Sequence, residues 1–104
     1  MPKISITVQH QLSPDEALAR IKNLLYQIKE AHQDKITDLH EDWAEFTSKF
    51  RFAYLGMSFS GTIAVKPNQV ILEGTIPLLA SMFQSKIEET IRKETEKLLT
   101  PTPA

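Results

Sequence analysis

The chain has 104 residues, a formal net charge of −1 and no cysteine. Its length suits a single domain, and 41% hydrophobic with 24% charged residues is typical of a globular protein. The near-neutral charge argues against a nucleic-acid binder that neutralises phosphates, and the lack of cysteine excludes disulfides, thiolate metal sites and a cysteine nucleophile.

The N-terminal part predicts a strand and then a helix. From Lys3 to Val8 apolar and polar residues alternate, which is typical of a strand with one buried face. The run Ser13–Glu16 (Ser-Pro-Asp-Glu) predicts a capping box: the Ser13 hydroxyl accepts from the Glu16 N–H, and the Glu16 carboxylate reaches back to the N–H of Ser13. The apolar stripe that follows predicts a helix to about His32.

Four further strands are predicted before the last helix. Three turns are expected to separate these four strands. The first lies near Trp43-Ala44, the second at Leu55-Gly56 and the third at residues 66–69. Aromatic residues alternate along the second of these strands, which indicates one face packed on helices. The predicted ranges are Ile36–Trp43, Glu45–Tyr54, Met57–Val65 and Val70–Ile76.

A final amphipathic helix is expected to start at Ser81, because Ser81-x-x-Gln84 is a second potential capping box. Its apolar stripe, which includes Leu79 and Phe83, is expected to pack on the sheet. The sequence therefore predicts an α+β fold in β-α-β-β-β-β-α order, with an antiparallel sheet of about five strands and two helices on one face. We expect one domain over residues 1–99 and a disordered tail over residues 100–104.

Candidate catalytic and metal-binding residues are few. Asp38, His40 and Asp42 alternate on one strand face and would reach a common cation, but an exposed acidic strand is the alternative that we favour. His10 either lines the mouth of a cleft or tethers a loop carbonyl, and we expect the tether. No hydrolytic triad or phosphate-binding loop is evident. The sequence thus predicts no catalytic residue, no metal site and no cofactor.

The aromatic residues form the one set with ligand-binding potential. They either fill the core of a small domain or line a groove between the sheet and the last helix. The residues of this candidate groove are Trp43, Phe50, Phe52, Tyr54, Phe59 and Phe83.

Landmarks throughout the chain carry a family resemblance. They comprise His10-x-Leu12, Ala17, Trp43 ahead of Phe50, Gly56-x-x-x-x-Gly61-Thr62-Ile63-x-Val65, Ile76-Pro77, and Ile87-Glu88 with Ile91. With these landmarks the chain, from Ile4 to about Leu99, resembles the polyhydroxyalkanoic acid system protein family, a group of small bacterial proteins. The resemblance implies a link to polyester granule metabolism, and it supplies no catalytic residue that could be carried over to this chain.

These observations favour a non-enzymatic binding or interaction module. Its partner would be a protein or a granule surface, and a homodimer through the open sheet face is a further option. The alternative is a carrier that holds a small hydrophobic acyl ligand between the sheet and the last helix. The N-terminus has no apolar run for a signal peptide, and no apolar stretch reaches about 18 residues, so we expect a cytoplasmic protein without a transmembrane segment, with granule association as an added option.

Overall fold

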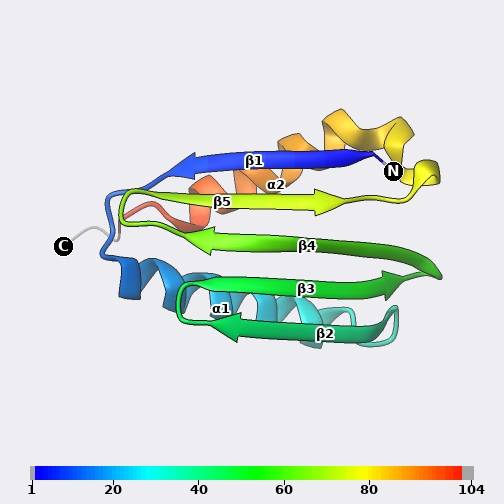
Figure 1. Ribbon diagram of the computed structural model, residues 1–104, viewed down its shortest axis with the longest axis horizontal. Coiled ribbons are helices and arrows are strands. Elements are labelled where there is room, and N and C mark those ends of the chain that lie inside the picture. Colours follow the sequence, from blue (N-terminus) through cyan, green and yellow to red (C-terminus); the bar gives the residue numbers. More distant parts are fainter. Residues whose placement is uncertain (1, 102–104) are drawn as a thin grey trace.

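The computed structural model describes residues 2–101 and has five strands, two α-helices and one 3-10 helix in that range (Figure 1). In chain order the elements are β1 (Lys3–Gln9), α1 (Pro14–Ala31), β2 (Ile36–Ala44), β3 (Thr47–Tyr54), β4 (Met57–Val65), β5 (Gln69–Thr75), η1 (Leu78–Phe83) and α2 (Gln84–Leu98).

The strands form one antiparallel sheet in the order β1-β5-β4-β3-β2. Four of them follow the chain as a meander, and β1 joins at the far edge beside β5, where Ile6 pairs with Leu72. Both helices lie on the same side of this sheet, and the other face is open (Figure 1). The predicted α+β class, the antiparallel sheet and the placement of both helices are confirmed.

The start of α1 follows the predicted cap in part. The Ser13 hydroxyl accepts from the Glu16 N–H at 3.2 Å, as expected. The Glu16 carboxylate does not return to Ser13; it accepts instead from Nε of Arg20, one turn further on, at 3.1 Å. Only half of the capping box is therefore present.

The β2–β3 hairpin differs from its prediction in two details. Asp38 has a φ of 53°, and the register of β2 against β3 shifts between Thr37 and His40, which marks a bulge. The turn lies at Glu45 and Phe46, and the φ of Glu45 is 55°. Strand β3 therefore begins at Thr47, because the left-handed backbone of Glu45 ends the extended conformation.

The core lies between the helices and the half of the sheet formed by β1, β5 and β4. On β1 the alternation is complete: Ile4, Ile6 and Val8 are buried and the residues between them are exposed. From α1, Ala17 and Ile21 pack into the same cluster. The β2 and β3 half of the sheet is covered less completely, since Ser48 is the only buried residue of those two strands.

The segment before α2 was predicted wrongly. Leu78–Phe83 form the 3-10 helix η1, and the α-helix begins at Gln84. The Ser81 hydroxyl does not cap a helix, because it donates to the carbonyl of Leu78 at 2.6 Å. Leu79 and Phe83 are exposed and do not pack on the sheet, so the inward stripe starts at Ile87.

Each edge of the sheet is protected against pairing with another strand. At the β1 edge, side chains of α2 bind main-chain carbonyls: Arg92 donates to Thr7 at 3.0 Å and Gln84 donates to Lys3 at 3.1 Å. At the β2 edge, the bulge at Asp38 and the acidic residues beside it serve the same purpose. The two edges are therefore poor surfaces for strand addition.

Candidate ligand-binding groove

An apolar cavity of about 370 Å³ lies between α1, α2 and the sheet. Its volume falls in the range of roughly 300–1,000 Å³ that small-molecule pockets occupy. The floor is made by strand residues, namely Ile6, Val8, Phe52, Ile63, Val70 and Leu72. The walls are helix residues, namely Ile21, Leu24, Leu25 and Ile28 of α1, and Thr90, Ile91, Glu94 and Thr95 of α2. We refer to this cavity as the inter-helix groove.

The groove exists because the two helices present different side chains to it. All four α1 residues are large and aliphatic, whereas Ile91 is the only such residue among the four from α2. Thr90 and Thr95 are short, and Glu94 is exposed, so its carboxylate stays near water. The α2 wall therefore leaves space that a row of leucines would fill.

The helices are joined at one end by a side chain that bridges them. Nη1 of Arg20 on α1 donates to the carbonyl of Leu98 at 3.0 Å and to that of Thr100 at 2.7 Å. From this end the helices diverge towards η1 (Figure 1). The Arg20 bridge also holds Thr100, the first residue of the predicted disordered tail; residues 102–104 of that tail lie outside the described residues.

The charge of the lining bears on the kind of ligand. Among the described residues, Glu94 is the only ionisable one that lines the groove, and its lining includes no lysine or arginine. A free fatty acid would bring its carboxylate towards a like charge without a cation to meet it. A neutral head group avoids that repulsion, and the hydroxyls of Thr90 and Thr95 are available to bind an ester or alcohol oxygen. The groove is therefore suited to an apolar chain with a neutral polar end.

Phe52 is the one residue of the six predicted groove residues that lines the inter-helix groove. Its ring stacks on that of Phe59, its cross-strand partner, with centroids 5.2 Å apart and planes at 10°. The ring of Phe50, two residues earlier on β3, also stacks on that of Phe52, with centroids 6.2 Å apart. The strand register places these three residues on the helix side of β3 and β4.

The other three predicted groove residues lie elsewhere. Trp43 has the Lys22 ammonium 5.0 Å from its ring centroid, and its Nε1 donates to Glu41 at 3.3 Å. The Tyr54 ring makes an edge contact with His32, and Phe83 is exposed on η1. The helix walls of the groove were not predicted from the sequence, although the shortage of large apolar residues on α2 is visible there.

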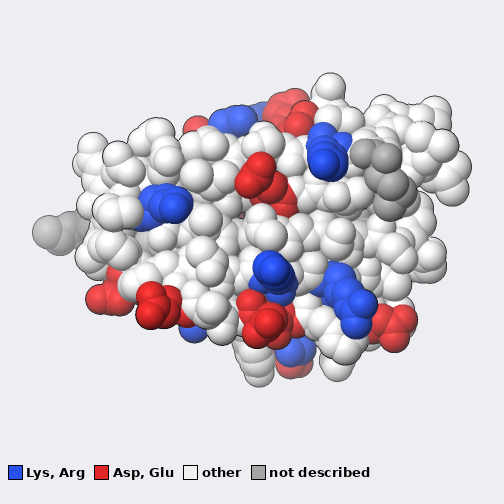
Figure 2. Space-filling model, viewed as in Figure 1, with Lys and Arg blue, Asp and Glu red and all other residues white. Residues whose placement is uncertain are grey.

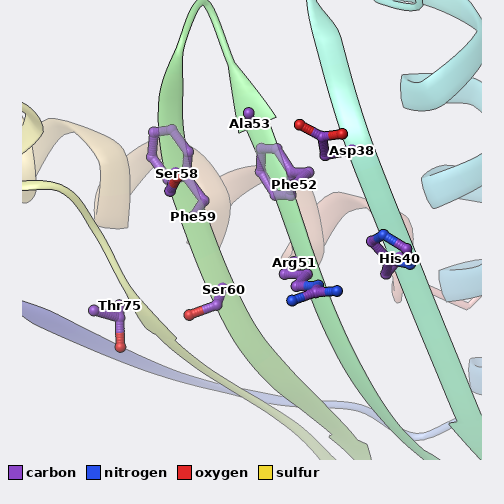
Figure 3. A pocket seen from close by; sticks show the side chains of 9 residues that line it. All are labelled: Asp38, His40, Arg51, Phe52, Ala53, Ser58, Phe59, Ser60 and Thr75. Atoms are coloured by element: carbon purple, nitrogen blue, oxygen red, sulfur yellow. The ribbon is translucent and has the colours of Figure 1, made fainter.

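The open face of the sheet carries a shallow hollow of about 490 Å³ with a mixed polar and apolar lining (Figure 3). A cross-strand row runs through it, in which His40, Arg51, Ser60 and Thr75 are successive neighbours. Figure 2 shows acidic and basic side chains interspersed over this face. Within residues 2–101 no hydrogen bond joins His40 to a hydroxyl of this row.

The predicted alternatives for Asp38 and His10 can be compared with their positions. The bulge places Asp38 outside the simple alternation, and no group of three acidic or histidine side chains in the described part of the chain is arranged to hold a metal.

His10 is buried; its Nδ1 accepts from the N–H of Leu12 at 3.1 Å and its Nε2 lies 2.9 Å from the carbonyl of Lys66. Because Nδ1 is the acceptor, Nε2 carries the proton and donates, so His10 tethers the β4–β5 turn as predicted.

Within residues 2–101, none of the helices is both long enough and apolar enough to cross a membrane.

The fold and the groove define a small α+β protein with an apolar cavity between sheet and helices. Residues 4–99 match the family described as "Putative polyhydroxyalkanoic acid system protein", and the chain belongs to that family. No curated protein matches it. Among solved structures it is similar to TTHA0849 from Thermus thermophilus, with 13% identity and a TM-score of 0.43 over 94% of this chain and 92% of that chain. That likeness is too distant to carry an argument.

Proposed function

We propose that this protein is a non-enzymatic binding protein whose inter-helix groove holds the apolar chain of a neutral acyl compound. The observation that carries the proposal is the lining of the groove, which is aliphatic and aromatic except for two threonines and one glutamate, all on α2. Transfer of an apolar chain from water into such a groove is favourable by about 0.8 kcal/mol per buried methylene.

The family suggests which acyl compound to consider. Polyhydroxyalkanoates are polyesters of hydroxy acids, so esters of their monomers are neutral at the carbonyl and carry apolar side chains. A medium-chain 3-hydroxyacyl ester therefore combines the two features that the groove favours. Its hydroxyl and ester oxygens would be placed near Thr90 and Thr95, and its chain over Phe52 and Leu72.

Association with storage granules is the second candidate function. The family description supports it. The 3-10 helix η1, which lies outside the groove and exposes large apolar side chains, supports it too. In this proposal the protein is located at a granule and exchanges acyl compounds there.

Calorimetric titration with a series of methyl 3-hydroxyalkanoates, kept below their aggregation concentrations, tests the acyl-binding proposal. Each added methylene that enters the groove is expected to raise the affinity by about fourfold, until the groove is full and the increase stops. Thr90→Trp should block the groove and abolish binding. Lys93→Trp is the matched control, because Lys93 is exposed on the same helix and does not line the groove.

The head-group preference has its own test. The methyl ester should bind more tightly than the free 3-hydroxy acid at pH 7, and Glu94→Gln should reduce this difference by improving the binding of the acid alone. Lack of binding by any chain length, or equal binding by Thr90→Trp and wild type, would contradict the proposal.

A further inference from the structure

The η1 segment has an inverted distribution of apolar residues. It buries its smallest apolar residue, Ala80, and exposes its four largest: Leu78, Leu79, Met82 and Phe83 are 74%, 74%, 80% and 61% exposed. A segment that served only to connect β5 to α2 would gain stability by turning some of these side chains inward. We refer to these four side chains as the η1 apolar tip.

The tip is held in place by the residues on both sides of it. Ala80 is buried and its N–H donates to the carbonyl of Pro77 at 2.9 Å. Gln84, the first residue of α2, donates to the carbonyl of Lys3 at 3.1 Å. Figure 1 places η1 at one end of the molecule, so an anchored backbone carries the four large side chains there.

The ionisable residues nearest the tip, along the chain and on β1, are two lysines, and two glutamates (Glu88 and Glu89) follow further along α2. Between Glu73 and Glu88 the only ionisable residue is Lys86, and Lys3 begins the strand to which Gln84 is bound. In Figure 2 the surface over η1 shows no acidic side chain on this side, and a basic side chain is visible towards β1. Apolar side chains flanked by lysine are complementary to an anionic lipid surface, in which the chains meet acyl tails and the ammonium groups meet phosphates.

The size of the tip argues against a second copy of the chain as its partner. A stable protein interface takes roughly 20–30 residues from each side, and the tip consists of four side chains on a six-residue segment. Insertion into a fluid surface has no such requirement, since each apolar side chain that leaves water contributes on its own.

We propose that the η1 apolar tip inserts into the surface of an anionic phospholipid layer and docks the protein there. Lys3 and Lys86 supply the electrostatic attraction, and the four apolar side chains supply the insertion. This docking is independent of the inter-helix groove, whose lining includes no residue of η1.

Flotation with vesicles tests the proposal, using phosphatidylcholine alone and phosphatidylcholine mixed with phosphatidylglycerol. Wild type should float with the mixed vesicles, and added salt should weaken the binding. The double variant Leu79→Ser/Met82→Ser should lose at least about tenfold in affinity, because two inserted side chains no longer favour the lipid. Both positions are exposed, so the variant should fold, which circular dichroism verifies.

Two control variants distinguish docking through the η1 apolar tip from non-specific adsorption to vesicles. Tyr26→Ser removes a side chain that is 60% exposed on α1, and it should leave vesicle binding unchanged. Lys86→Glu should weaken binding to the mixed vesicles only. The proposal is overturned if wild type does not float with the mixed vesicles, or if the double variant floats as well as wild type. It is also overturned if sedimentation shows a wild-type dimer that the double variant abolishes, since the tip would then bind a second copy.

Discussion

The ring of Phe50 lies directly over Gly61, its cross-strand partner on β4: a Cβ built on Gly61 would be 2.9 Å from Cζ of Phe50. The same Cβ would come still closer to the carbonyl oxygen of Glu73 on β5. Gly61 is therefore required by space, because the aromatic ring and the neighbouring backbone occupy the position of a side chain.

Gly61→Ala is expected to lower the free energy of unfolding by about 1–3 kcal/mol or more, since neither the ring nor the backbone can move away freely. Urea unfolding followed by circular dichroism measures this loss. Gly56→Ala is the comparison: its Cβ would meet no atom within 4 Å, but its φ of 81° would still strain alanine by about 1 kcal/mol. A Gly61→Ala variant as stable as wild type would show that the Phe50 ring does not occupy this position.

Ser13→Ala should destabilise the protein by about 0.5–2 kcal/mol, because the Glu16 N–H loses its side-chain acceptor at the start of α1. Ser81→Ala, which removes the other predicted cap, should change stability by less than about 0.5 kcal/mol, since Ser81 bonds only the exposed carbonyl of Leu78. Chemical denaturation of both variants provides the comparison. Equal effects would indicate that neither hydroxyl, or both, act as caps.

His10→Ala should be destabilising by about 1–3 kcal/mol, because it leaves the Leu12 N–H and the Lys66 carbonyl without their partner next to the core. His40→Ala and Asp42→Asn on the exposed face should each stay within about 0.5 kcal/mol of wild type. Thermal unfolding at one fixed pH gives the three values. If His10→Ala were as mild as the other two, the tether to the β4–β5 turn would be unimportant for stability.

Phe52→Ala separates groove lining from solid core. Ile76 is 3% exposed and does not line the groove, and Ile76→Ala should cost about 2–5 kcal/mol, as a buried core residue does. Phe52 is only half-buried and borders an existing cavity, so Phe52→Ala should cost less than the about 3–5 kcal/mol of a fully buried phenylalanine. Urea midpoints of the two variants test the difference. If Phe52→Ala lowered the free energy of unfolding by the about 3–5 kcal/mol of a fully buried phenylalanine, the interior would be filled and there would be no groove at this position.

Local chemistry accounts for what could be predicted from the sequence. Ser13 specifies the start of α1, and the alternation of Ile4, Ile6 and Val8 specifies which face of β1 is buried. The bulge at Asp38 could not be predicted, because a single left-handed residue leaves no mark on the pattern around it. At η1 the apolar spacing continued the helical period of α2, and this similarity led to the wrong helix start at Ser81.

The groove depends on tertiary geometry. Whether Ile28 and Ile91 face each other across a space or touch is decided by the divergence of two helices far apart in the sequence, and by the Arg20 bridge at one end. No local pattern encodes that distance. The aromatic pattern predicted a groove on the helix-covered face of the sheet, where the inter-helix groove lies. Of the six predicted residues, however, only Phe52 lines it.

Intermolecular nuclear Overhauser effects between methyl-labelled protein and methyl 3-hydroxydecanoate test the binding of an acyl chain in the groove most directly. We expect contacts from the ligand chain to the methyl groups of Ile21, Leu24 and Ile91, which come from both helix walls. These contacts should vanish in Thr90→Trp. Contacts confined to Leu79 and Met82 of η1, or none to the helix walls at saturating ligand, would contradict the proposed function.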